Sequence, residues 1–235
     1  MDDICELQNT DESSILTNLM KRYERDSIYT YASKTLIAIN PCRNVENLYG
    51  LDKMKKKFNR IVGRSSPHIY EIANEARRSA HHKPQSLLIT GVSGSGKTET
   101  TKHIIDFLCN SSRSPHIKCV GSVINANLIL ESFGNAQTCG NHNSSRFCKF
   151  VELHYDNKSE LIGARTSCYL LEISRVCAVN QNESNFNIFY TILLGSPEHL
   201  RKKLFLDVST HYKFLPDQEM VMGCSFTHPD ILKQI

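Results

Sequence analysis

Apolar residues recur every three or four positions in five stretches of the chain, as they do on the buried face of an amphipathic helix. Capping residues precede the first stretch at residues 10–13, and Pro67 precedes the second, where the first turn of a helix accepts proline. Gly134 follows the fourth stretch as a C-terminal cap. The pattern predicts helices around residues 15–23, 69–76, 104–108, 123–133 and 186–194.

Runs of β-branched and aromatic residues form a second pattern, which is typical of strands. Two such runs lie at residues 28–31 and 35–39, and the short apolar run 85–90 suits a buried strand. Two further runs, 150–155 and 159–165, are separated by a polar turn and predict a hairpin. Because helices and strands are mixed along the whole chain, the predicted fold class is α/β.

The composition fits a soluble globular protein, since 40% of the 235 residues are hydrophobic and 22% are charged. The formal net charge of +4 is too small to indicate nucleic acid as a partner, and no nucleic-acid motif accompanies it. The basic run at residues 53–60 is interpreted as a solvated surface, with contact to an acidic partner as the alternative.

The nine cysteines include no CxxC pair, and His81 and His82 are adjacent rather than a turn apart. These spacings favour free thiols in a reducing compartment over a metal site or a disulfide framework. The first residues are acidic, unlike a signal peptide, and no apolar run approaches the roughly 20 residues that span a bilayer. We therefore expect a cytoplasmic protein without a transmembrane segment.

Residues 91–98 satisfy the phosphate-loop pattern GxxxxGK[ST] through Gly91, Gly96, Lys97 and Thr98. Glycines let the backbone curl so that successive N–H groups point at phosphate oxygens, and the following helix N-terminus favours anions. Lys97 can reach the β- and γ-phosphates, and the Thr98 hydroxyl can ligate Mg²⁺. The strand predicted before this loop and the helix predicted after it make nucleotide binding the preferred interpretation.

A second polar block follows at residues 141–150, after the segment LESFGNAQT. Ser144 and Ser145 are adjacent hydroxyls that can bond phosphate oxygens or Mg²⁺, and Arg146 can pair with a carboxylate or stabilise transferring charge. From this block alone, a polar turn with a surface arginine is as good an interpretation as a phosphate or Mg²⁺ site.

Several blocks together resemble the myosin motor head. GVSGSGKTETTK, LESFGNAQT, NHNSSRFCKF and CYLLEISRV are similar to the myosin phosphate loop, linking helix, switch I and following strand, and they occur in the family's order. Tyr29 and the pair Asn40-Pro41 resemble the segment that leads to the adenine pocket. The resemblance runs from about residue 3 to about residue 215.

The resemblance implies ATP and Mg²⁺ as ligands and a role for each matched residue. Lys97, Ser144 and Arg146 would act in catalysis, with Ser144 positioning the attacking water. Arg146 would pair with a switch II glutamate, and Thr98 and Ser145 would hold Mg²⁺. The residues implied to line the nucleotide are Asn40, Pro41, Gly91, Val92, Ser93, Gly94, Ser95, Gly96, Lys97, Thr98 and Asn141.

The chain departs from the family at several positions. Val92 replaces a usual glutamate and Ser95 a usual alanine, while Cys148 replaces a glycine in switch I, which puts catalytic rate in doubt more than binding. No switch II motif of the Asp-Ile-x-Gly-Phe-Glu type occurs between Leu171 and Ile235. The resemblance thus implies the P-loop core of a myosin head truncated before switch II, with weak binding and poor turnover by this segment alone.

We expect three segments within this partial motor domain: an N-terminal part with the adenine-pocket segment at 1–84, the phosphate-loop and switch I core at 85–170, and the start of the upper actin-side subdomain at 171–235. In a full-length head the implied function is MgATP hydrolysis that drives movement on actin filaments, in the cytoskeleton, with light chains as further partners. Residues 168–190 are similar to the mitochondrion-associated class of unconventional myosins.

Two other functions compete with the motor. One is a catalytically incomplete, myosin-like ATP-binding module, which Cys148 and the missing second switch support. The other is a small P-loop kinase, but such a kinase should show an arginine-rich lid after the loop, and NxNSSRF and YLLExSR occur there instead.

Overall fold

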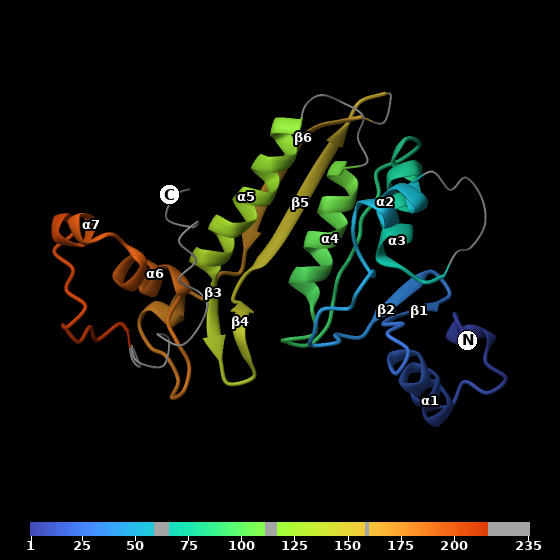
Figure 1. Ribbon diagram of the computed structural model, residues 1–235, viewed down its shortest axis with the longest axis horizontal. Helices are drawn as coiled ribbons and strands as arrows, with labels where there is room; N and C mark the ends of the chain where they lie inside the picture. The colour runs from blue at the N-terminus through green and yellow to red at the C-terminus, as the bar shows by residue number, and fades with distance from the viewer. Residues whose placement is uncertain (59–65, 111–116, 158–159, 216–235) are drawn as a thin grey trace. The chain divides into compact units, whose positions relative to one another are not determined.

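The computed structural model describes residues 1–58, 66–110, 117–157 and 160–215 (Figure 1). Helices and strands are mixed along the chain, as the sequence predicts. The chain divides into two compact units. The first comprises Met1–Pro115 with Tyr155–Leu161, and the second comprises His116–His154 with Ile162–Ile235.

In the first unit, the two strands predicted near the N-terminus form an antiparallel hairpin in which Tyr29 lies opposite Ala38 and Ala32 opposite Thr35. The first helix begins at its cap Asp11, whose carboxylate accepts from the backbone of Ser14 at 3.3 Å. The elements of this unit are η1 (Ile4–Glu6), α1 (Glu12–Tyr23), β1 (Tyr29–Ala32), β2 (Thr35–Ala38), α2 (Leu51–Phe58), α3 (Ile69–Ala80) and α4 (Lys97–Asn110).

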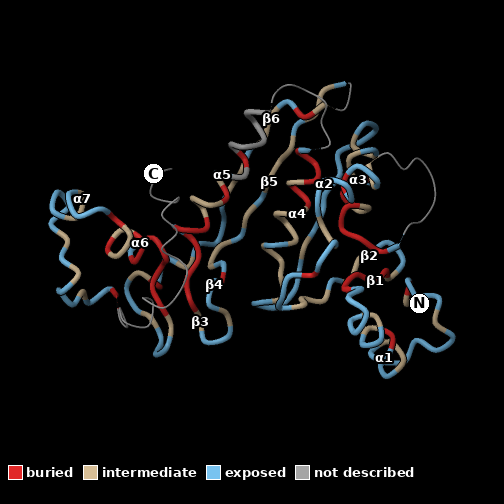
Figure 2. Tube along the Cα trace, viewed as in Figure 1, coloured by how far each residue is buried: buried red, intermediate tan, exposed pale blue. Residues whose placement is uncertain are grey.

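The core of the first unit lies where α3 packs against α4. Tyr70 and Phe107 stack with ring centroids 4.9 Å apart, and both are almost fully buried. Ile104, Ile105 and Leu108 are buried on the same helix, which confirms the apolar face predicted for it. In Figure 2 the buried positions of this unit gather along β1, α3 and α4.

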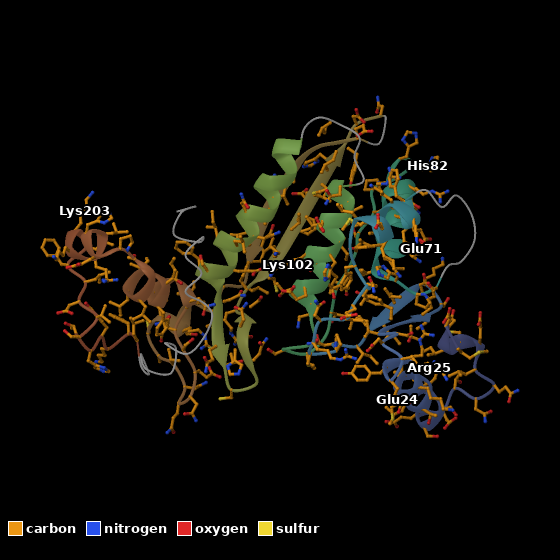
Figure 3. All side chains as sticks on the ribbon, viewed as in Figure 1. Glu24, Arg25, Glu71, His82, Lys102 and Lys203 are labelled. Carbon is orange, nitrogen blue, oxygen red and sulfur yellow. The ribbon has the colours of Figure 1, made fainter. Side chains whose placement is uncertain are left out.

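The basic run at residues 53–60 lies largely on α2, and its last two residues fall outside the described part of the chain. Lys53, Lys55 and Lys56 are exposed, as a solvated surface requires. Lys57 differs, because its ammonium lies 3.6 Å from the carboxylate of Glu71 on α3, which Figure 3 labels. The run is therefore mostly surface, and its last helical lysine ties α2 to α3.

The strand predicted at residues 85–90 is wrong for this structure. These residues form neither a strand nor a helix, and Leu88 is 90% exposed. An apolar strand of a parallel sheet needs hydrogen-bonding neighbours on both sides, and no described strand pairs with this run. The run is apolar, but the described residues contain no strand that pairs with it, and without such a partner it does not form a strand.

In the second unit, a long helix runs directly into a short antiparallel hairpin. Asn135 lies opposite Ser145 and Ala136 opposite Ser144, and an irregularity follows before Thr138 pairs with Asn141. The elements are α5 (Ile117–Gly134), β3 (Asn135–Thr138), β4 (Asn141–Ser145), β5 (Cys148–Tyr155), β6 (Leu161–Tyr169), η2 (Ile173–Val176), α6 (Asn187–Gly195) and α7 (Glu198–Lys203).

The predicted hairpin around residues 156–158 is confirmed, since β5 and β6 pair in one two-stranded sheet. Its end is tied by Asp156, whose backbone N–H donates to the carbonyl oxygen of Glu160 at 2.9 Å. The carboxylate of Asp156 accepts from the backbone N–H of Glu160 at 2.8 Å. Tyr155 and Leu161, at this tip, belong to the first unit.

Among the described residues of the second unit, buried apolar side chains gather in clusters around β3 and α6. Ala136 and Phe186, which also form a β-bridge, pack with Ile188. Tyr190 and Leu193 pack with Leu215 farther along the chain. Figure 2 shows the buried positions of this unit along β3 and α6. Across the described residues, no helix combines the length and apolar character that crossing a bilayer requires.

Candidate nucleotide site

The phosphate loop leads directly into the N-terminus of α4. Gly94 and Gly96 have φ angles of 77° and 91°, a region that residues with a Cβ seldom occupy. The backbone N–H of Thr100 donates to the carbonyl oxygen of Gly96 at 2.9 Å and so starts the helix. The two glycines therefore let the chain curl immediately before a helix N-terminus, whose unpaired N–H groups and dipole favour an anion.

The side chain of Lys97 curls back over this loop. Its ammonium donates to the carbonyl oxygens of Gly91 and Val92, each at 2.8 Å. The positive charge is thus held at the mouth of the loop by two backbone dipoles. A phosphate oxygen could replace these neutral acceptors with a charged one, which makes a shorter and stronger hydrogen bond.

Asn40 connects the segment after β2 to the phosphate loop. Its side-chain N–H donates to the carbonyl oxygen of Gly94 at 2.7 Å, while its own Oδ1 accepts from the backbone of Cys42 at 2.9 Å. The carbonyl oxygen of Pro41 accepts from the hydroxyl of Tyr23 at 3.4 Å. The structure therefore brings Asn40, which the sequence implied for the adenine side, against the loop implied for the phosphates.

The remaining loop residues differ in exposure. Val92 is 78% exposed, and Ser93 is exposed too, whereas Ser95 is partly buried. Thr98 lies in the first turn of α4, directly after Lys97. An exposed valine in place of an acidic residue leaves the backbone of the loop unobstructed, which suits a site that works through N–H groups.

Of the residues predicted to form switch I, Asn141, Ser144 and Ser145 lie on β4, and Arg146 follows this strand. The Oδ1 of Asn141 accepts from the backbone N–H of Asn143 at 3.0 Å, so this amide is turned onto its own strand. Ser144 is buried at 3% exposure and Ser145 is exposed. The two hydroxyls therefore point to different environments, as alternate residues of a strand do.

Asn143 fixes the middle of this strand from both sides. Its Oδ1 accepts from the side-chain amide of Asn135 on β3 at 3.0 Å and from that of Asn187 on α6 at 3.2 Å. Sequence reasoning attached no role to Asn187. The amide contact shows that it couples the first turn of α6 to the switch I strand.

Arg146 is engaged by a carboxylate that sequence reasoning missed. Its Nε donates to Oε2 of Glu172 at 2.6 Å, and its Nη1 donates to Oγ of Ser144 at 3.3 Å. The hydrogen bond from Arg146 is the main cause that lowers the pKa of Glu172. The only available signal was a glutamate in the segment YLLExSR, 26 residues away, and nothing in its spacing indicated the pairing.

Gly134, at the end of α5, lies against the ring of the residue that follows Arg146. A Cβ on Gly134 would come within 2.4 Å of the ring of Phe147. The carbonyl oxygen of Gly134 also accepts from the backbone N–H of Arg146 at 2.8 Å. The glycine is needed here for this close approach; it is the last residue of α5 and does not have the positive φ of a glycine cap. Cys148, which follows at the start of β5, is exposed.

The phosphate-loop residues and Asn40 belong to the first unit, and the switch I residues belong to the second. Within the first unit the structure brings together a loop, a lysine and an asparagine. Within the second it brings together a serine, an arginine and a glutamate.

Both units carry motifs that resemble one family, and comparison with known proteins identifies it. The family model described as Myosin head (motor domain) matches residues 1–226. Myosin heavy chain 95F of Drosophila melanogaster is 44% identical over 216 residues, which is 91% of this chain and 17% of that protein. Unconventional myosin-VI of Bos taurus is 38% identical over 239 positions, 100% of this chain and 18% of that protein.

A third relative, Myosin type-2 heavy chain 2 of Schizosaccharomyces pombe, is 41% identical over 221 residues, 92% of this chain and 10% of that protein. The chain belongs to the myosin head family. It spans less than a fifth of the length of each of these relatives. The family match does not favour the small P-loop kinase, and assignment to the mitochondrion-associated class stays a prediction.

Proposed function

We propose that this chain is the ATP-binding part of an actin-based motor head, built on a P-loop nucleotide-binding core and able to bind MgATP. The observation that carries the proposal is the loop of residues 91–98, where three glycines with positive φ precede a helix N-terminus and Lys97 lies over the loop. Family membership supplies the class of nucleotide and the motor function.

In this proposal the loop backbone wraps the phosphates, and Lys97 leaves the carbonyl oxygens of Gly91 and Val92 to bond the β- and γ-phosphate oxygens. Asn40 holds Gly94 in place and, with Pro41, borders the adenine side. Asn141 approaches the phosphates from switch I. Binding is driven by backbone N–H groups and one ammonium, so it tolerates Val92 and Ser95, whose side chains replace those usual in the family.

Two hydroxyl residues would hold Mg²⁺: Thr98 in the first turn of α4 and Ser145 on β4. Hydroxyl oxygens suit this ion, because Mg²⁺ takes hard oxygen ligands and keeps several waters. When bound, the metal supplies charge neutralisation of the β- and γ-phosphates. Ser144 would orient the attacking water, and Arg146 would stabilise charge on the transferring phosphoryl group.

The full-length protein, in this proposal, hydrolyses ATP to move on actin filaments in the cytoskeleton, with light chains as further partners. Segments corresponding to 1–84, 85–170 and 171–235 would supply the adenine side, the phosphate and switch I core, and the start of the actin-side subdomain. Arg146 would also pair with a switch II glutamate in that longer head.

The direct test is equilibrium binding of a fluorescent ATP analogue to the purified chain in the presence of Mg²⁺. Saturable binding is expected for the native chain and for Lys102→Ala. Lys102 lies on the same helix (Figure 3), and its ammonium pairs with Glu99 on the helix surface at 2.9 Å. Lys97→Ala should weaken binding at least tenfold, because a charge-assisted hydrogen bond to phosphate contributes about 1.5–3 kcal/mol.

The outcome against the proposal is equally specific. If the folded native chain shows no saturable binding, the anion-binding loop is not functional in this chain. If Lys97→Ala binds as tightly as Lys102→Ala, the analogue occupies another site. Far-UV circular dichroism of both variants establishes that they remain folded.

A further inference from the structure

The carboxylate of Glu172 lies between two guanidinium groups in the second unit. Its Oε2 accepts from Nε of Arg146 at 2.6 Å and from Nε of Arg175 at 2.8 Å. Several other ion pairs of the described residues join one cation to one exposed carboxylate, as Lys202 and Glu198 do at 2.8 Å. Glu172 instead joins the switch I arginine to a buried one, since the side chain of Arg175 is only 4% exposed.

Arg175 holds Glu172 rigidly because all of its nitrogens are engaged. Nη2 donates to Oε2 of Glu183 at 2.9 Å, and Nη1 donates to the carbonyl oxygen of Ser184 at 2.8 Å. Glu183 is itself mostly buried, with 13% of its side chain exposed. A buried arginine with three fixed acceptors leaves its shared carboxylate little rotational freedom, unlike a solvated surface pair.

The backbone reinforces this arrangement. The N–H of Glu172 donates to the carbonyl oxygen of Arg146 at 3.0 Å, and the N–H of Arg146 donates to that of Gly134 at 2.8 Å. Arg146 is therefore joined to residue 172 through both its main chain and its side chain. With Nε fixed, the planar guanidinium has one orientation, in which Nη1 donates to Oγ of Ser144 at 3.3 Å.

We propose that Glu172 is a positioning residue of the nucleotide site: it fixes the orientation of Arg146 and, through Arg146, the hydroxyl of Ser144. The inference rests on the proposed function, in which these two residues face the γ-phosphate and the attacking water. Arg146 donates to the hydroxyl oxygen of Ser144, so the direction of the guanidinium governs where that hydroxyl is held. Glu172 thus sets the direction of the guanidinium and, through it, the position of the serine hydroxyl.

A purely structural role for Glu172 makes a different prediction. A structural ion pair changes stability and the fraction of folded protein, and it leaves the turnover of each correctly folded site unchanged. A positioning role changes the chemical step for each site, since small displacements of catalytic groups cost up to about 100-fold in rate. Measurements normalised to active sites separate the two.

The test compares Glu172→Gln with Glu152→Gln in the complete head, by single-turnover hydrolysis and by affinity for the fluorescent ATP analogue. Glu152 is a matched control, because its side chain is 37% exposed against 33% for Glu172 and it also pairs with an arginine, Arg165 at 3.9 Å. Glu172→Gln should lower the hydrolysis rate per active site about 10- to 100-fold. Its affinity for the analogue should change less than about threefold, because the phosphate loop is untouched.

Each outcome decides a different point. A native head that neither binds nor hydrolyses MgATP overturns the proposed function. A native head that does both, with Glu172→Gln as fast per site as Glu152→Gln, overturns the positioning role alone. If Glu172→Gln does not fold, Glu183→Gln is measured instead, because it removes a charged partner of Arg175 without changing a contact of Arg146. A reduced hydrolysis rate per site supports the positioning role of Glu172, and an unchanged rate overturns it.

Discussion

Asn40 and Gly94, 54 residues apart in the sequence, are joined by a hydrogen bond of 2.7 Å from the side-chain amide to the backbone carbonyl. Gly94 is one of the three loop glycines with positive φ, so the bond acts on the part of the loop that the motif leaves most flexible. Asn40 therefore restrains the phosphate loop from outside its own segment.

Asn40→Ala should weaken binding of the fluorescent ATP analogue about fivefold, because loss of one hydrogen bond costs about 1 kcal/mol. Asn44→Ala, an exposed position in the same loop, is the control and should leave affinity unchanged. Equal affinities for the two variants would show that the loop keeps its shape without Asn40. Isothermal titration provides the measurement independently of the fluorophore.

The dependence of the free energy of unfolding on pH should reflect the protonation of His68. Its Nδ1 accepts from the backbone N–H of Tyr70 at 3.0 Å, and its Nε2 lies 2.9 Å from the carbonyl oxygen of Leu48, to which it donates in the neutral form. Burial lowers its pKa to about 4 from the ordinary 6.5. Protonation would place a hydrogen on Nδ1, which now accepts, and so remove the cap of α3.

Because the folded pKa is lowered, the unfolded chain binds the proton first as the pH falls. The contribution of His68 to the free energy of unfolding is complete above pH 6.5 and is lost progressively as the pH falls to 4. The loss amounts to about 3 kcal/mol, at about 1.4 kcal/mol per pKa unit. His68→Asn, which can cap the helix and does not titrate, should flatten this part of the curve. Urea unfolding of both proteins between pH 7 and pH 4 checks it, and parallel curves would exclude His68 as the cause.

Gly134→Ala should destabilise the chain by about 1–3 kcal/mol, because the new methyl group would overlap the ring of Phe147 and force it to move. Gly140→Ala is the matched control, since a Cβ there meets nothing within 4 Å. The displaced ring adjoins Arg146, so the variant should also slow hydrolysis in the complete head. Thermal unfolding of both variants gives the comparison, and similar midpoints would contradict the close contact.

Thr98→Val should reduce the Mg²⁺ dependence of nucleotide binding, because the isosteric valine removes the proposed metal ligand without changing the helix. In the native chain, chelation of Mg²⁺ should weaken binding of the analogue, and in the variant the same treatment should have little further effect. Thr100→Val, two residues along α4, should behave as the native chain does. A native-like Mg²⁺ titration for Thr98→Val would show that the metal is held elsewhere.

The parts of the structure that sequence predicts best are those set by local pattern. The buried face of α4, with Ile104, Ile105 and Leu108, follows from helical spacing, and the phosphate loop follows from its glycines and lysine. The pairing of Arg146 with Glu172 could not be predicted in this way. Their 26-residue separation has no periodicity, and one carboxylate is chosen among 24 acidic residues only when the chain has folded.

The run 85–90 shows the opposite case, in which a correct local pattern predicts the wrong element. Its apolar residues suit a strand, yet a strand exists only through neighbours that share its hydrogen bonds. The apolar stripe predicted on α1 is similar, since the helix forms but Leu16 and Met20 remain more than half exposed. The spacing of apolar residues indicates which surface is suited to burial, and contacts with other parts of the fold decide whether that surface is buried.

The exposed run before the phosphate loop has a practical consequence for handling the protein. Leu88 is 90% exposed beside Leu87, and no strand of the described residues pairs with this run. An exposed apolar segment of this kind is a template for adding strands from other molecules. Concentrated preparations should therefore self-associate through this segment and occlude the loop that follows it. Dilute samples, or a Leu88→Lys variant acting as a gatekeeper, should keep the chains apart and leave the nucleotide loop accessible.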